Sequence, residues 1–146
     1  KSVGGGDLGI MDYILAGAAI GFLVIETVAD QQQWDYQEEK YRRKRNGEEL
    51  GPEYEKGFTH HGLWSIMRHP NYFGECLIWW GFFFITLSTP TSWWTVISPV
   101  VVTAVLLKMT GIPLMEKIIV DTRPGYRNYI RRTPAFFPWF PKKDKP

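Results

Sequence analysis

The sequence predicts an all-α integral membrane protein with about three transmembrane helices, because its apolar residues gather in three blocks of nearly membrane length. A helix needs about 20 predominantly apolar residues to cross a bilayer. The blocks are residues 9–28, 72–87 and 93–112, and each is apolar on all of its faces. Tryptophan pairs at 79–80 and 93–94 lie near the expected membrane–water interfaces, which tryptophan favours. A soluble bundle with three buried helices is the alternative, and these observations favour the membrane protein.

Basic residues occur on both sides of the second and third blocks, but not between them. They are Lys40, Arg42, Arg43, Lys44, Arg45, Lys56 and Arg68, then Lys117, Arg123, Arg127, Arg131, Arg132, Lys142, Lys143 and Lys145. Two spans separate these two basic segments, so both fall on one side, which the positive-inside rule makes the cytosolic or matrix side. We therefore expect a single domain over residues 1–146. It has an extended amphipathic and basic region facing the cytosol or matrix, and an irregular, proline-rich tail over 116–146.

The first helix is expected to continue beyond the membrane, because residues 26–45 contain neither glycine nor proline. Glu38 with Arg42 and Glu39 with Arg43 are ion pairs spaced by four residues, in the order that favours a helix. The helix is expected to stop at Asn46-Gly47, because glycine readily adopts the left-handed conformation that ends many helices.

Prolines predict the other boundaries. Pro70 suits the first position of a helix, so the helix of the second block should begin near it. Pro99 lies within the third block and would kink a helix there. Four prolines between 124 and 141 exclude one long tail helix. We expect a short helix over Tyr126–Arg132 and then an extended strip pressed against an interface or another subunit.

Composition and motif spacing exclude several classes of function. A net charge of +2 is too small to indicate a nucleic-acid partner, and a single cysteine, Cys76, excludes an internal disulfide. No signal peptide is expected, because Lys1 is a lone positive charge and no small-residue cleavage site follows the first block. No glycine-rich loop follows a strand, so a Rossmann cofactor site is excluded. No metal site is expected, because His60, His61 and His69 with Cys76 do not have a recognised ligand spacing.

A group of polar residues marks the start of the second block: Arg68, Asn71, Tyr72 and Glu75. Asn71 and Glu75 would lie one turn apart on one helix face, with Arg68 close enough to approach Glu75. An ionisable residue at membrane depth is costly and therefore indicates a functional site. A structural role stays open, in which Glu75 pairs with Arg68 or Lys108 and pins helices together.

Four segments resemble the C-terminal domain family of the steroid 5-alpha-reductases and its bacterial and protist relatives. They are "ETVADQQQW" from Glu26 to Trp34, "GLWSIMRHPNYFGE" from Gly62 to Glu75, "TGIPLMEK" from Thr110 to Lys117, and "GYRNYIRRTPAFFPWFP" from Gly125 to Pro141. The resemblance covers nearly the whole chain and keeps the order of the family's motifs. It is specific for the family and much less specific for a substrate.

The resemblance implies a helical membrane enzyme that binds NADPH in a polar cavity between helix ends. Asn71 and Glu75 match the asparagine and glutamate that help to hold the cofactor in that family. The other positions that match the cofactor side are Asp30, Arg68, Tyr72 and Gly74. The implied reaction is NADPH-dependent reduction of a carbon–carbon double bond conjugated to a carbonyl, in a lipid or sterol-like substrate. The resemblance assigns no catalytic residue to this chain.

Two departures from the family favour alternative functions. Better-known members have about seven spans rather than three, and the steroid reductases carry Arg and His where this chain has Ile112-Pro113 and Glu116-Lys117. The first alternative is a non-catalytic, supernumerary subunit of a larger membrane complex. The second is a membrane methyltransferase that uses S-adenosylmethionine, because "RHPNY" also resembles an element of the enzymes acting on isoprenylcysteine or phospholipids. The expected partners are membrane lipids and other subunits of such a complex, without nucleic acid. The expected location is the endoplasmic reticulum or an inner membrane of an organelle such as the mitochondrion.

Overall fold

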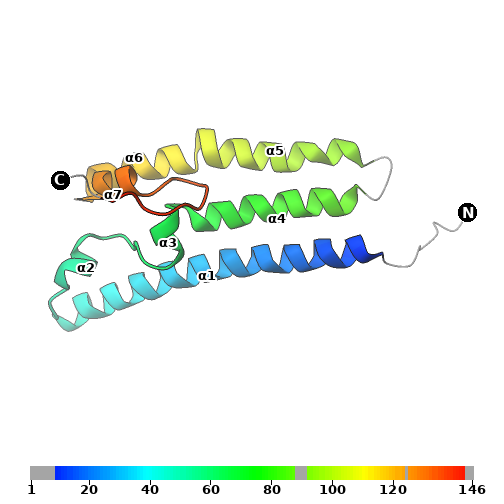
Figure 1. The fold of residues 1–146 in the computed structure, drawn as a ribbon. Helices are drawn as coiled ribbons and strands as arrows, with labels where there is room; N and C mark the ends of the chain where they lie inside the picture. Colours follow the sequence, from blue (N-terminus) through cyan, green and yellow to red (C-terminus); the bar gives the residue numbers. More distant parts are fainter. Residues whose placement is uncertain (1–8, 88–91, 124, 144–146) are drawn as a thin grey trace, which may run out of the picture.

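Three antiparallel helical rods lie side by side, with short helices gathered at one end (Figure 1). The computed structural model describes residues 9–87, 92–123 and 125–143, and no strand occurs in these ranges. The rods are α1 (Ile10–Asn46), α4 (Pro70–Thr86), and a third made of η1 (Trp93–Val96), α5 (Ile97–Ala104), η2 (Val105–Met109) and α6 (Ile112–Thr122). The short helices are α2 (Gly51–Glu55), α3 (Leu63–Ile66) and α7 (Tyr126–Arg132). The predicted boundaries at Pro70 and at Tyr126–Arg132 are confirmed.

Helix α1 is one continuous helix of 37 residues, as its lack of glycine and proline after the first block predicts. At its start, the Asp12 carboxylate accepts a hydrogen bond of 2.8 Å from the Gly9 N–H. At its end, Gly47 has a φ of 67° and its N–H bonds back to the carbonyls of Arg43 and Lys44. The predicted stop at Asn46-Gly47 is confirmed, because the left-handed residue turns the chain out of the helix.

The predicted ion pairs on α1 are only half confirmed. The Arg43 Nε lies 2.7 Å from the Glu39 Oε1, as expected. Arg42 does not pair with Glu38. It lies 2.7 Å from Glu39 and 2.8 Å from Glu48. The turn at Gly47 brings Glu48 back beside Arg42, and a planar guanidinium can bind two carboxylates at once.

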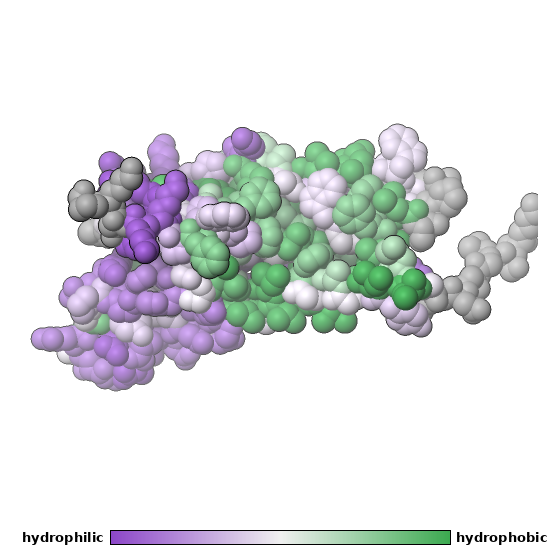
Figure 2. Space-filling view, in the orientation of Figure 1, coloured by the Kyte–Doolittle hydropathy of each residue, from purple (hydrophilic) through white to green (hydrophobic). Residues whose placement is uncertain are grey.

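Within the described ranges, two helices are long and apolar enough to cross a membrane: α1, and the rod from Trp93 to Thr122. None of the apolar stretch of α1 is fully buried inside the protein, and many of its aliphatic side chains are exposed on the faces that α4 does not cover. Figure 2 shows hydrophobic residues along the rods and hydrophilic residues at the end that carries α2 and α7. An apolar surface of this extent indicates contact with lipid. Helix α4 has 17 residues, or about 26 Å, and is shorter than the roughly 30 Å hydrocarbon core.

The polar end of the molecule collects both basic segments. The C-terminal half of α1, the short helices and the tail all lie there, and the chain reaches the opposite end between α4 and η1 (Figure 1). The charge pattern assigns the uncharged link between the second and third apolar blocks to that opposite side. This link lies mostly at residues 88–91, outside the described residues. The two basic segments therefore share one end of the molecule, as the charge pattern predicts.

Close contacts hold α4 between its two neighbours. A Cβ built on Gly74 would lie 2.9 Å from the Cβ of Glu26, so α1 and α4 approach closely only because residue 74 has no side chain. On the other side, the Trp80 Nε1–H donates a hydrogen bond of 3.1 Å to the Thr103 Oγ1 of α5. Small residues and interhelical hydrogen bonds are the usual means by which helices associate in lipid.

The third rod is irregular, but not at the proline that the sequence singles out. Pro99 lies in the first turn of α5, where a missing N–H leaves no helical bond unmade. The irregularity comes later, at the π-helical turn η2, where the N–H groups of Thr110 and Gly111 both bond to the carbonyl of Val105. This break lets α6 begin as a new helix that carries Glu116 toward the polar end.

Candidate functional site at the polar end of the helices

A buried arginine organises the polar end. Arg68 precedes α4, and its side chain is only 8% exposed. Its Nε lies 2.6 Å from the Glu116 Oε1, and its Nη2 lies 3.2 Å from the Oε2, so the two groups meet in a bidentate pair. Its Nη1 donates to the carbonyls of Ile130, at 3.0 Å, and of Thr133. One guanidinium therefore joins the start of α4 to α6 and to the end of α7.

His69 extends this network. Its Nε2 lies 2.9 Å from the Glu116 Oε1, and its ring stacks on Tyr72 with centroids 5.4 Å apart and planes 7° apart. The backbone N–H groups of Arg68 and His69 donate to the carbonyls of Pro134 and Ala135, at 2.9 and 3.1 Å. The tail therefore runs beside the start of α4, and its first residues are fixed by both main-chain and side-chain bonds.

The predicted approach of Arg68 to Glu75 is wrong, and so is the structural alternative that pairs Glu75 with Arg68 or Lys108. Arg68 binds Glu116 instead. In the described part of the chain, the Glu75 carboxylate has no hydrogen-bond or ion-pair partner, and it lies close enough to Glu26 of α1 for the two charges to repel each other. The physical reason is that Arg68 precedes α4 and its guanidinium binds Glu116 of α6, whereas Glu75 lies near Glu26 of α1.

Sequence reasoning missed Glu116, which lies 48 residues after Arg68. A signal was present, because Glu116 is the only carboxylate in the first two turns of α6. A buried cation such as Arg68 needs an anion, and this one was available. The sequence alone does not show that Arg68 and Glu116 lie on segments that face each other.

A cavity of about 280 Å³ lies beside this network. The polar and aromatic residues in its wall include Arg68, His69, Asn71, Tyr72, Arg123 and Tyr126. The Asn71 Oδ1 is buried and has no hydrogen-bond partner among the described residues. A buried amide oxygen without a partner costs free energy, which marks Asn71 as the polar group of the cavity wall whose hydrogen bonding is incomplete.

Two tyrosines of α7, Tyr126 and Tyr129, are buried in an aromatic cluster at the polar end. Phe58 packs edge-on against Tyr126 and stacks on Tyr129, with centroid distances of 5.0 and 5.3 Å. Burial raises the pKa of both phenols well above the usual range, and the nearby Glu116 carboxylate adds to this for both. Both phenols are therefore neutral near pH 7. The Tyr129 hydroxyl donates a hydrogen bond to the carbonyl of Trp64.

The structure brings together only part of the predicted cofactor set. Arg68, Asn71 and Tyr72 line the cavity. Gly74 is buried against α1, and Glu75 lies near Glu26. Asp30 is exposed on α1 and is not part of the cavity wall. Gln33 of α1 also lines the cavity, so Asn71 lies where α4, α1 and the polar end meet.

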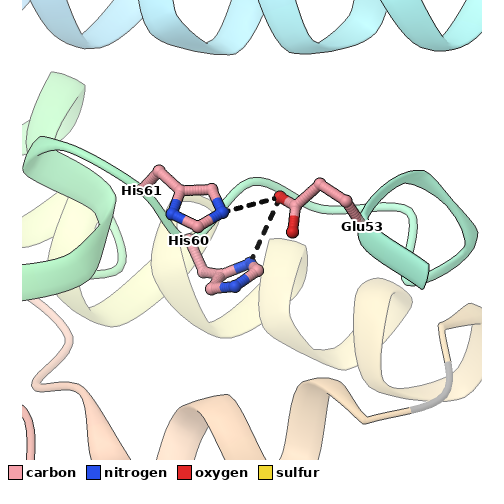
Figure 3. Close-up of side chains that lie close together, drawn as sticks. All are labelled: Glu53, His60 and His61. Atoms are coloured by element: carbon pink, nitrogen blue, oxygen red, sulfur yellow. Dashed lines mark ion pairs between the residues drawn. The ribbon is translucent and has the colours of Figure 1, made fainter. Parts of the chain in front are cut away.

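A second cluster lies outside this cavity, in the segment that connects α1 to α3. The side chains of Glu53, His60 and His61 converge, and their ligand atoms all lie within 4.8 Å of one another (Figure 3). Burial lowers the pKa of His60, an effect that Glu53 partly offsets. These three residues could hold a metal ion. The ligand spacing tested in the sequence combined the histidines with Cys76 and did not include Glu53, which lies seven residues before His60.

Two helices long enough and apolar enough to cross a membrane, joined to a polar end that contains a cavity, indicate a helical membrane protein. Residues 2–133 match a family described as "Protein of unknown function (DUF1295)", and the chain belongs to this family.

The chain is also similar to "Uncharacterized protein C594.04c" of Schizosaccharomyces pombe (strain 972 / ATCC 24843). The two are 33% identical over 140 residues, which cover 89% of this chain and 40% of that protein. The chain therefore spans about two fifths of the length of this relative. No solved structure matches.

Proposed function

We propose that the chain is a membrane reductase of the steroid 5-alpha-reductase type, with α4 as a third membrane crossing. Its reaction would be the NADPH-dependent reduction of a double bond conjugated to a carbonyl in a lipid or sterol-like substrate. The motif resemblance supports the reaction class. The observation that carries the site is the buried Asn71 Oδ1, which has no partner in the described residues and lies in the wall of a cavity at the polar end.

The residues of the cavity fit one end of the cofactor. A volume of about 280 Å³ is at the lower limit for small-molecule sites, which run from about 300 to 1,000 Å³. It suits a single ring with its amide rather than a whole dinucleotide. The carboxamide of a nicotinamide has N–H donors that match the unused Asn71 oxygen. The rest of the dinucleotide would extend out of the cavity, and Arg123 in the wall carries a positive charge suited to its phosphates.

The chain's own residues would bind the NADPH and orient its nicotinamide ring. Asn71 would accept the carboxamide hydrogen bond, and Tyr72 would be held in place by its stacking on His69. Four of the five guanidinium contacts that Arg68 can make are used by Glu116 and two carbonyls, so Arg68 positions α4 instead of binding phosphate. When bound, NADPH supplies the hydride.

The proposal predicts that replacing Asn71 weakens NADPH binding, whereas replacing Glu75 of the same motif does not. Asn71→Ala is expected to weaken NADPH binding about five- to tenfold, because a hydrogen bond worth roughly 1–1.5 kcal/mol is lost. Glu75→Gln is the matched control on the same helix, and its affinity should stay within about threefold, since Glu75 is not in the cavity wall. Cofactor fluorescence titration of both variants in lipid discs measures this. Normal binding in Asn71→Ala with loss in Glu75→Gln would move the site to the contact between α1 and α4.

The second candidate is a non-catalytic subunit of a membrane complex, and the tail favours it. Phe137, Trp139 and Phe140 are 71%, 73% and 81% exposed. Aromatic residues left uncovered at a membrane face suit packing against another protein. Extraction in a mild detergent would distinguish the candidates. A complex that loosens when Trp139 and Phe140 are changed to serine, together with a chain that does not bind NADPH, supports the subunit.

A further inference from the structure

Three potential metal ligands converge on one point at the polar end, away from the cavity beside Asn71. Glu53 comes from α2, and His60 and His61 come from the loop between α2 and α3 (Figure 3). The Glu53 Oε1 lies 3.0 Å from the His61 Nε2 and 3.7 Å from the His60 Nδ1. One carboxylate oxygen therefore faces two imidazole nitrogens.

These close contacts are not hydrogen bonds. The Glu53 Oε1 and the His60 Nδ1 are both buried, and neither has a hydrogen-bond partner in the part of the chain that the structure describes. The 3.0 Å approach of His61 to Glu53 lacks the direction that a hydrogen bond needs. Buried polar atoms without partners are rare in native proteins and call for an explanation such as an unseen ion.

The separations match those around a tetrahedral metal ion. Zinc binds histidine nitrogen and carboxylate oxygen at about 2.0–2.2 Å, so two ligand atoms at a tetrahedral angle lie about 3.4 Å apart. The observed 3.0 and 3.7 Å lie on either side of that value. All three ligand atoms lie within 4.8 Å of one another, so small side-chain rotations would bring them to the separations of a bound ion.

Neighbouring residues add one carboxylate to the surroundings and hold the ligands in place. Asp35 lies in the same shallow hollow as Glu53 and His61. The Tyr36 hydroxyl donates a hydrogen bond of 3.1 Å to the Glu53 carbonyl, and its ring stacks on Tyr54 at 5.2 Å. Helix α2 is therefore fastened to α1, which fixes the position of the Glu53 backbone. Such supporting contacts are typical around metal ligands.

We propose that Glu53, His60 and His61 form a binding site for one divalent transition-metal ion, with Zn²⁺ as the best match. Two imidazoles and a carboxylate suit Zn²⁺ and its neighbours, whereas Mg²⁺ and Ca²⁺ prefer oxygen ligands only. The side chain of His61 is 69% exposed, so a fourth position faces solvent and can take water or another ligand. The bound ion would fasten the segment 53–61 at the polar end. This inference is independent of the NADPH proposal.

The test is a metal titration of the whole chain in detergent or lipid discs, purified without a polyhistidine tag. Co²⁺ is the first probe because its visible absorption reports coordination, and Zn²⁺ follows by displacement of the Co²⁺. We expect one ion per chain. His61→Asn and Glu53→Gln should each lower the affinity by about a hundredfold or more, since loss of an outer-shell partner alone costs about 10- to 100-fold.

Glu55→Gln is the matched control, because Glu55 lies on the same short helix and is exposed. Its affinity should stay within about twofold of the wild type. Helix content by circular dichroism without metal should be the same in all variants, since His61 lies on the surface. Saturable binding that survives in His61→Asn and Glu53→Gln, or wild-type protein that binds no Co²⁺ or Zn²⁺, would overturn the proposal.

Discussion

Replacing Glu116 by leucine is expected to be the most destabilising single change at the polar end. The change leaves Arg68 buried and without its only carboxylate, while His69 loses its partner as well. Removing one member of a buried ion pair typically costs about 3–5 kcal/mol. Unfolding in mixed detergent micelles, followed by tryptophan fluorescence, measures the loss in the free energy of unfolding.

Two further variants show whether the cost comes from the buried charge. Glu48→Gln breaks an exposed pair with Arg42 and should cost far less than Glu116→Leu, because solvent screens that pair. Arg68→Met combined with Glu116→Leu removes both charges, and it should recover part of the stability lost in Glu116→Leu alone. Full recovery is not expected, because Arg68 also binds two backbone carbonyls. A Glu116→Leu variant as stable as Glu48→Gln would contradict the buried network.

The second large effect is expected at the contact between α1 and α4. Alanine at position 74 would place its Cβ 2.9 Å from the Glu26 Cβ and 3.1 Å from the Glu26 Cα, so the helices must move apart. Overpacking of this kind typically costs about 1–3 kcal/mol. The measurement is the same unfolding experiment, with helix insertion checked by circular dichroism.

Gly81→Ala is the matched control on the same helix. Its Cβ would lie 3.6 Å from the Phe22 ring, which is an ordinary contact. Both substitutions gain up to about 1 kcal/mol of helix propensity, so the difference between them isolates the clash. We expect Gly81→Ala to be neutral or stabilising and Gly74→Ala to be destabilising. Equal effects at the two positions would mean that α1 and α4 do not approach closely at Gly74.

Local chemistry allowed several boundaries to be predicted from the sequence. Gly47 ends α1 and Pro70 begins α4, because the backbone preferences of glycine and proline act on their own residues. The apolar blocks predicted helices long enough to cross a membrane, and α1 and the third rod meet that test. Charge patterning placed both basic segments at one end, because it depends only on the number of crossings between them.

The partners across the site could not be predicted in the same way. Arg68 was assigned to Glu75 because they are close in sequence, but Glu116 reaches Arg68 only after the third rod breaks at η2 and returns to the polar end. The contact of Glu53 with His60 and His61 likewise depends on how α2 is fastened to α1 through Tyr36. Such contacts arise from tertiary packing, which spacing along the chain does not encode.

The central claim is that the cavity beside Asn71 binds the nicotinamide end of NADPH. The most direct measurement is an equilibrium titration of the wild-type chain in lipid discs with NADPH, and in parallel with S-adenosylmethionine. We expect saturable binding of NADPH at one site per chain, and we expect no saturable binding of S-adenosylmethionine. Saturable binding of S-adenosylmethionine instead, or the absence of NADPH binding at millimolar concentration, would contradict it.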